Sequence, residues 1–184
     1  MAKTKSIKRF SSCIKGALMA RVSILLPIYN SISRNGDGFL QQAVDSLLKQ
    51  TYTDFELHIL DNISTDTTPD ICKKFAKKDK RVKFQIDTQQ RFPEGGINKL
   101  AENVNTEYLM IANCDDLWDY HYIENLIKIL DNDQSIALAY SNGAYIDIEN
   151  ITSNPLIRNP EFIYNKDINY NFCLSIQFRN VVPL

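Results

Sequence analysis

Two adjacent carboxylates, Asp115 and Asp116, lie two residues beyond the apolar run YLMIA at residues 108–112. A short apolar run of this kind is consistent with a buried strand, so the pair stands where a strand ends. Two like charges at one point either decorate a solvated turn or hold a cation. Carboxylate oxygens are ligands for hard divalent ions such as Mg²⁺ and Mn²⁺, so the second possibility is a metal site.

Other apolar runs end in the same way. Polar or aromatic side chains follow three of them: Tyr29 and Asn30 after residues 22–28, Asp61 and Asn62 after residues 55–60, and the stretch DTQQR after residues 82–86. Open α/β sheets bind ligands at the carboxyl ends of their strands. An acidic edge repels a phosphate, but a divalent ion on Asp115 would allow a diphosphate to bind there.

Amphipathic segments with helical spacing separate the apolar runs. Strands are expected within residues 21–30, 55–62, 82–86, 107–113 and 136–147, and helices at 37–50, 68–79, 97–104 and 122–132. Thr68 is expected to cap the second helix, because Pro69 suits its first position. The strands are apolar rather than alternating, which predicts an α/β fold: an open, mostly parallel twisted sheet with helices on both faces, a Rossmann-like three-layer sandwich.

Several functional classes are excluded by missing motifs. The sequence has no G-x-G-x-x-G for a dinucleotide, no G-x-x-x-x-G-K-[ST] phosphate loop and no G-x-S-x-G elbow. Residues 1–21 carry six basic and no acidic residues, which leaves 15 basic against 22 acidic residues in the remainder. Such an acidic body disfavours nucleic acid as a partner.

The basic leader, residues 1–20, has two interpretations: a disordered start, or a peripheral contact with anionic lipid. Four widely spaced cysteines form no C-x-x-C pair, which favours reduced thiols. With no apolar stretch long enough for a membrane span, which takes about 20 residues, the expected location is cytoplasmic with possible membrane association.

Three segments resemble, in order and spacing, the family 2 glycosyltransferases with the GT-A fold. They are VSILLPIYN, LQQAVDSLLKQTYTDFELHILDNISTDTT and GGINKLAENVNTEYLMIANCDDLW, within residues 21–150. The resemblance implies a nucleotide-sugar donor, usually a UDP- or dTDP-sugar, and Mn²⁺ or Mg²⁺ as cofactor. Residues 21–150 would be the nucleotide-sugar-binding core, and 151–184 would begin an acceptor-side region that is apparently truncated.

The resemblance also implies roles for single residues. Tyr29 would lie against the nucleobase, Asp61 would accept a hydrogen bond from it, and Asp66 would order the same loop. Asp115 would hold the metal, with Asn113 as a second candidate ligand. The nucleotide-binding set that it implies is Pro27, Tyr29, Asn30, Asp61, Asn62, Asp66, Asn98, Asn113 and Asp115.

Two departures stand out: Asn113 replaces the usual Asp, and Thr106 replaces a Gly before the fourth strand. Trp118 has two interpretations, as core packing or as a sugar-stacking ring. His58 and His121 have no partners at ligand spacing.

The implied reaction transfers a sugar to the hydroxyl of a glycan or lipid-linked saccharide, with inversion at the anomeric carbon, as in polysaccharide biosynthesis. It needs a general base, which is expected beyond Leu184 because the late acids Asp147, Glu149, Glu161 and Asp167 have no matching context. The alternatives are a non-catalytic nucleotide- or sugar-binding module on the same fold, and a nucleotidyltransferase-like protein.

Overall fold

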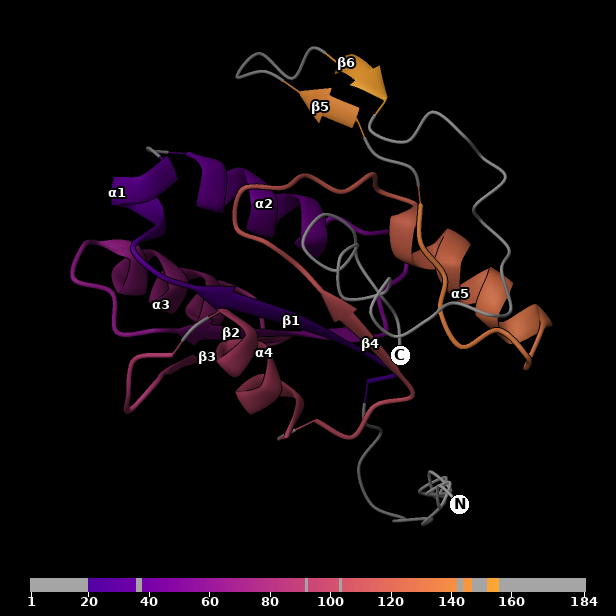
Figure 1. The fold of residues 1–184 in the computed structure, drawn as a ribbon, viewed down its shortest axis with the longest axis horizontal. Helices are drawn as coiled ribbons and strands as arrows, with labels where there is room; N and C mark the ends of the chain where they lie inside the picture. The colour runs from indigo at the N-terminus through magenta and orange to yellow at the C-terminus, as the bar shows by residue number, and fades with distance from the viewer. Residues whose placement is uncertain are drawn as a thin grey trace, which may run out of the picture.

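The computed structural model describes residues 20–35, 38–91, 93–102, 104–141, 144–146 and 152–155. Its centre is a sheet of four strands in the order β3-β2-β1-β4. The strands are β1 (Val22–Ile28), β2 (Phe55–Asp61), β3 (Val82–Ile86) and β4 (Tyr108–Ile111). All three pairings are parallel, so the four carboxyl ends lie at one edge. The predicted α/β fold is confirmed, and Figure 1 shows helices on both sides of the sheet.

The register aligns the strand ends that carry the candidate residues. Ile28 pairs with Asp61, which in turn pairs with Ile86. On the other side of β1, Leu25 pairs with Ile111. The backbone continues this alignment past the strands, because Ala112 N donates to Leu25 O at 2.9 Å and Asn62 N donates to Ile28 O at 2.8 Å. The loops after β2 and β4 therefore flank the loop after β1.

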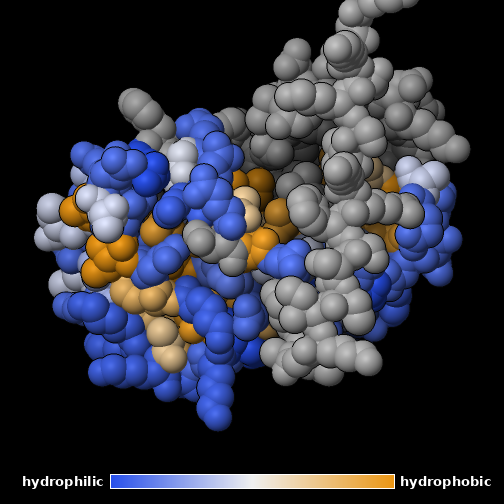
Figure 2. Space-filling view, turned by 90° about the horizontal axis from the view of Figure 1, so that it is seen from below, coloured by the Kyte–Doolittle hydropathy of each residue, from blue (hydrophilic) through white to orange (hydrophobic). Residues whose placement is uncertain are grey.

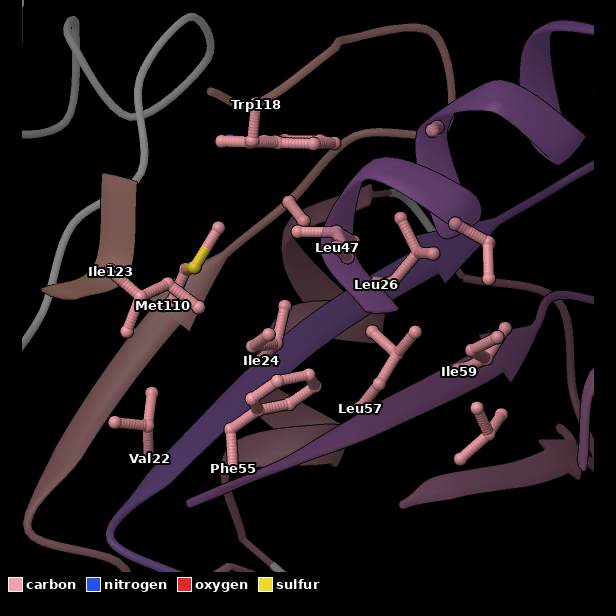
Figure 3. Close-up of a cluster of buried hydrophobic side chains, with 14 of the residues drawn as sticks. Val22, Ile24, Leu26, Leu47, Phe55, Leu57, Ile59, Met110, Trp118 and Ile123 are labelled. Carbon is pink, nitrogen blue, oxygen red and sulfur yellow. The ribbon is translucent and has the colours of Figure 1, made fainter. Parts of the chain in front are cut away.

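One face of the sheet carries the main core. It is covered by α2 (Phe39–Leu48), α3 (Thr68–Lys78) and α5 (Tyr122–Asn132), whose buried apolar side chains pack with those of the strands. Figure 3 shows alternate residues of β1 and β2, such as Ile24 and Leu57, pointing into this core. Burial of large aliphatic side chains contributes about 1.5–3 kcal/mol each, so this face fixes where the strand ends lie.

The other face has a thinner cover. It carries α4 (Pro93–Ala101) and a small cluster built on Leu25, Leu60 and Leu100. Figure 2, seen from below the view of Figure 1, shows apolar surface between hydrophilic regions. Gly96 allows close packing here, since a Cβ at this position would lie 3.1 Å from the Cβ of Pro27.

Three helices differ from the prediction: α1 (Ser31–Asn35) was not expected, α2 is shorter at both ends, and α4 both begins and ends earlier than residues 97–104. The helix α1 fills the loop after β1. The helix α2 begins at Phe39, after Gly38 with φ of 102°, while Asp37 lies outside the described residues. The helix α4 begins four residues earlier than expected, at Pro93, because proline suits a first helical turn.

The predicted cap of α3 is also wrong. The N-cap position belongs to Thr67, and Thr68 is the first helical residue. The Thr68 hydroxyl instead accepts a hydrogen bond from Ile32 N at 3.3 Å, so it braces α1. Thr68 is fully buried, so its hydroxyl contacts the backbone of α1 rather than solvent.

The predicted fifth strand at residues 136–147 does not extend the parallel sheet. Residues 136–141 form no strand, although Ala139 and Tyr140 are buried. Ile136 and Ala139 pack on the core without strand pairing, so apolarity alone was misleading. Within the same range, β5 (Ala144–Ile146) pairs antiparallel with β6 (Thr152–Pro155).

Among the residues that the structure describes, no helix combines the length and apolarity needed to cross a bilayer. Cys72 and Cys114 are free thiols, as expected, and Cys13 and Cys173 lie outside the described residues.

Candidate nucleotide and metal site

The loop after β2 is built on Asp61, whose side chain is fully buried. Its carboxylate accepts hydrogen bonds from the backbone N and the hydroxyl of Ser64. The Ser64 hydroxyl in turn accepts from Asn30 N at 2.7 Å, and Asn30 Oδ1 accepts from Thr65 N at 2.8 Å. The loops after β1 and β2 are therefore cross-linked, with Asp61 beneath them.

Two residues of these loops have left-handed backbones. Asn30 has φ of 46° and Ile63 has φ of 61°. Asparagine tolerates this region, whereas a β-branched residue there is an outlier. Ile63 is also exposed, so no buried contact of its side chain offsets the strain. Strain of this kind clusters at functional sites, which directs attention to this loop.

Asp66 orders the start of α3 and the end of the loop. Its carboxylate accepts from Ser33 N, from the Ser33 hydroxyl and from Thr68 N, all at 2.9 Å. Desolvation acts to raise the pKa of Asp66, but the hydrogen bonds from Thr68 and Ser33 outweigh it and lower the pKa to about 2. Asp66 is therefore ionised and fully engaged in holding α1 against α3.

Asn62 links the loops after β2 and β3. Its Nδ2 donates to Arg91 O at 2.5 Å, and its Oδ1 accepts from Arg91 N at 2.7 Å. Arg91 Nε also donates to Asp87 at 2.6 Å. Desolvation of the buried Asp87 opposes its ionisation, but Arg91 outweighs this and holds the pKa of Asp87 below its usual value. Both polar atoms of the Asn62 amide are thus bonded to the backbone of Arg91.

The loop after β4 carries Asn113 and the acidic pair. Asn113 Nδ2 donates to Asp116 Oδ2 at 2.8 Å, and Ser31 donates to Cys114 Sγ at 3.3 Å, which joins this loop to α1. Burial raises the pKa of Asp116; the bond from Asn113 opposes the shift, and the charge of Asp115 adds to it. Burial likewise raises the pKa of the Cys114 thiol.

Asp115 differs from the other acids of this edge. It is exposed and, within the described residues, has no hydrogen-bond or ion-pair partner. A bare carboxylate beside a second acid is a donor set that suits a hard divalent cation. No group of three His, Cys, Asp or Glu in the described part of the chain could hold a metal by itself. The residues therefore fit a cation that takes most of its ligands from a diphosphate and water, as Mg²⁺ commonly does.

The remaining candidates lie at different distances from this centre. Pro27 is the penultimate residue of β1 and packs against α4, while the half-buried Tyr29 follows the strand end. Asn98 lies apart from these loops. It is exposed on α4, which covers the face of the sheet opposite the main core. Trp118 is buried and lies with Leu47 and Met110 in Figure 3, which supports core packing.

Sequence reasoning missed residues that organise the site. Ser33, Ser64 and Thr68 bond Asp61, Asp66 or the loop backbone. A signal was present for this loop, because an Asp side chain commonly hydrogen-bonds the backbone of the residues just after it in a turn. The late acids Asp147, Glu149, Glu161 and Asp167 lie outside the described residues, as do most of the leader and of residues 151–184.

Comparison with known proteins identifies relatives. The family model described as Glycosyl transferase family 2 matches residues 23–179. An uncharacterized glycosyltransferase of Haemophilus influenzae is 28% identical over 131 residues, which cover 71% of this chain and 50% of that protein. The chain spans between 15% and 50% of the length of the first four curated relatives that it matches.

Solved structures share the fold. Staphylococcus aureus TarS 1–349 in complex with UDP aligns with a TM-score of 0.57 and 21% identity, covering 65% of this chain and 34% of that one. The mannosyltransferase PcManGT from Pyrobaculum calidifontis, in complex with GDP-Man and Mn²⁺, aligns with a TM-score of 0.58 and 21% identity, covering 69% and 36%. At this identity the likeness establishes the GT-A architecture of the sheet and its helices.

Proposed function

The chain belongs to glycosyl transferase family 2, and on this premise we propose that it binds a nucleotide-diphosphate sugar and takes part in transferring that sugar to an acceptor hydroxyl. The observation that carries the proposal is the meeting of three loops at one edge of the sheet. These loops follow β1, β2 and β4, and they carry Asn30, Asp61 and Asp115. A ligand with a base, a ribose and a diphosphate is long enough to touch all three.

The two halves of the edge suit the two halves of such a ligand. The loops after β1 and β2 are cross-linked by Asn30, Ser64 and Asp66, so they form a fixed surface for the nucleoside. Tyr29 supplies an aromatic ring beside that surface. Because Asp61 is buried under Ser64, we assign its main role to shaping the loop, and a direct bond to the base requires Ser64 to give way.

The loop after β4 suits the diphosphate. Asp115 would hold a divalent cation, with Asn113 and Asp116 beside it. When bound, that cation supplies Lewis-acid stabilisation of the leaving diphosphate. The Mn²⁺ in the PcManGT complex supports this choice of metal. The protein's own part is to present to the metal one carboxylate that has no partner among the described residues, and to keep Asp116 oriented through the bond from Asn113.

The donor proposed first is a UDP- or dTDP-sugar, with a glycan or lipid-linked saccharide as acceptor. The UDP in the TarS complex supports a uridine donor, while GDP-Man in PcManGT shows that this fold also accepts guanosine. We further propose inversion at the anomeric carbon, with a carboxylate base contributed from outside the described residues.

Thermal denaturation with a panel of nucleotides tests the proposal. UDP, dTDP and GDP are each added with Mn²⁺, and then with Mn²⁺ and a chelator. A ligand at a hundred times its dissociation constant adds about 2.7 kcal/mol of stability, so a true donor nucleotide gives a clear rise in Tm that the chelator reduces. No stabilisation by any nucleotide would contradict the proposal. Binding without transfer or hydrolysis of the matching nucleotide sugar would favour a non-catalytic module.

A further inference from the structure

The last turn of α2 and residues 50 and 51, which follow its C-cap, contact the segment that follows the acidic pair. Three polar residues make these contacts: Ser46, Gln50 and Thr51, here called the α2 anchor. They lie about 70 residues before their partners in the sequence, and those partners are Trp118, Asp119, Tyr120, Ile123 and Glu124.

Gln50 bonds the backbone of this segment at two positions with one side chain. Its side chain is buried, and its Nε2 donates to Asp119 O at 2.6 Å. Its Oε1 accepts from Ile123 N at 3.0 Å, at the first turn of α5. A single amide thus bonds the backbone on both sides of the turn at residues 120–122. A buried side chain with donor and acceptor both satisfied holds its partners in one arrangement.

The other two anchor residues bond the same segment. The Ser46 hydroxyl donates to Ala43 O at 2.8 Å and accepts from Trp118 N at 3.3 Å. Thr51 N donates to Tyr120 O at 2.8 Å, and the Thr51 hydroxyl donates to Glu124 Oε2 at 2.8 Å, with Tyr120 O 3.2 Å away. The backbone from residue 118 to residue 123 is therefore bonded at four positions to the α2 anchor.

Asp115 itself has no partner within the described residues, so only its backbone sets its position. That backbone is bounded by β4, which ends at Ile111, and by the anchored segment that begins at Trp118. We propose that Gln50 is a positioning residue that holds Asp115 where it meets the metal and the diphosphate. This inference rests on the proposed function and adds to it a residue just after α2, outside the three loops of the site.

A purely structural role for Gln50 would lower stability without a specific effect on the metal. A positioning role has a different consequence, because loss of an outer residue that orients a metal ligand weakens metal binding by about 10-fold or more. The quantity to measure is therefore the ratio of UDP affinities with and without Mn²⁺, determined by titration calorimetry. The affinity for uridine, which has no phosphate, reports on the nucleoside half alone.

The variants are Gln50→Met, which keeps the length of the side chain and removes both bonds, and Thr51→Val, a milder change on the surface. The control is Val82→Ala, which opens a small cavity at the start of β3, at the other end and the far edge of the sheet. Amide hydrogen exchange at Trp118 and Ile123 reports directly on the anchored backbone, without any ligand.

We expect Gln50→Met to speed exchange at Ile123 and to reduce the Mn²⁺ effect on UDP affinity by about 10-fold, with uridine affinity unchanged. Thr51→Val should give a smaller change of the same kind, and Val82→Ala none. A folded Gln50→Met protein with the wild-type Mn²⁺ effect overturns this inference alone; if Gln50→Met does not fold, the same result with Thr51→Val overturns it. Absence of any Mn²⁺ effect on UDP affinity in the wild type overturns both this inference and the proposed function.

Discussion

Single residues at the carboxyl edge divide into those whose polar atoms are used inside the protein and those that face solvent. Asp61, Asp66 and Asn62 belong to the first group, because their side chains bond loop backbone or loop hydroxyls. Asp115 belongs to the second. All four are polar residues at or after strand ends, so the sequence alone does not separate the two groups. Only their partners indicate that the first three shape the site and that Asp115 is available to a ligand.

Ile63 should be a point of removable strain. The left-handed region costs a residue with a Cβ about 1–2 kcal/mol, and glycine loses about 0.5–1 kcal/mol through its freer unfolded chain. Ile63→Gly is therefore expected to stabilise the protein by about 0.5–1 kcal/mol in urea denaturation. Ile63→Ala keeps the Cβ and should gain less. A glycine variant less stable than the alanine variant would refute this explanation of the backbone.

Because of Asp116, the free energy of unfolding should fall as pH rises, which is the opposite of the effect of a carboxylate with a lowered pKa. Its pKa is raised above the usual 3.8, mainly by burial, so the folded state holds the proton more strongly than the unfolded state. The resulting stabilisation is complete below the usual carboxyl pKa and is lost as pH rises through the raised value.

Asp116→Asn removes that charge and can still accept the bond from Asn113. We expect it to raise Tm at pH 7, with a gain that shrinks as the pH falls toward 3.8. Parallel thermal melts of the variant and the wild type across this range measure it. An equal or lower Tm for the variant at pH 7 would be inconsistent with the shift.

At the scale of elements, α5 is fastened to the amino end of the sheet by one charged cluster. Arg21, before β1, donates to both carboxylate oxygens of Asp131 on α5 and to Glu107 before β4. The Tyr108 hydroxyl donates to Asp131 at 2.8 Å. The bonds from Arg21 and Tyr108 lower the pKa of Asp131. The cluster joins three elements at the edge opposite the candidate site.

Asp131→Asn should weaken this joint. Because the side chains are partly exposed, the expected loss at pH 7 is about 0.5–1 kcal/mol. The difference from wild type should shrink as pH falls below 3.8 through the lowered pKa, where the native carboxylate also becomes protonated. Lys128→Gln breaks an exposed pair on the same helix and should change stability less. Equal losses in the two variants would argue against a special role for the Arg21 cluster.

The sequence predicted elements well where apolar spacing was strong and failed where side chains pack without backbone pairing. The helix at 122–132 and the strand at 82–86 have the predicted bounds, because their apolar periodicity is complete. Residues 136–141 are also largely apolar, yet Ile136 and Ala139 pack on the core and none of the six joins the ladder. The helix α1 is a single short turn held by Asp66 and Thr68, and contacts from a distant segment leave no local pattern.

The same reasoning applies to the site. Strand ends placed Asp61 and Asp115 at one edge, since parallel pairing makes that a consequence of the strand assignments. The sequence could not indicate that the Asn62 amide would be taken up by Arg91, or that Gln50 would reach Asp119 across 69 positions. Those facts depend on tertiary contacts, which spacing along one chain does not encode.

At the scale of the whole molecule, the two ends of the sheet have separate tasks. The amino end carries the Arg21 cluster, which secures the fold, and the carboxyl end carries the exposed Asp115. A charge change at the amino end should therefore leave nucleotide binding unaffected. This division is the basis for matched control variants in which an exposed carboxylate is neutralised at either end.

The most direct measurement is calorimetric titration of UDP, with and without Mn²⁺, into the wild type, Asp115→Asn and Asp54→Asn. Asp54 is an exposed carboxylate at the amino end of β2, and its substitution matches the change in charge. We expect Mn²⁺ to strengthen UDP binding in the wild type and in Asp54→Asn, and to have little effect in Asp115→Asn. An undiminished Mn²⁺ effect in Asp115→Asn would contradict the assignment of the metal site. A wild type that binds no UDP with Mn²⁺ present would contradict a uridine donor at this edge.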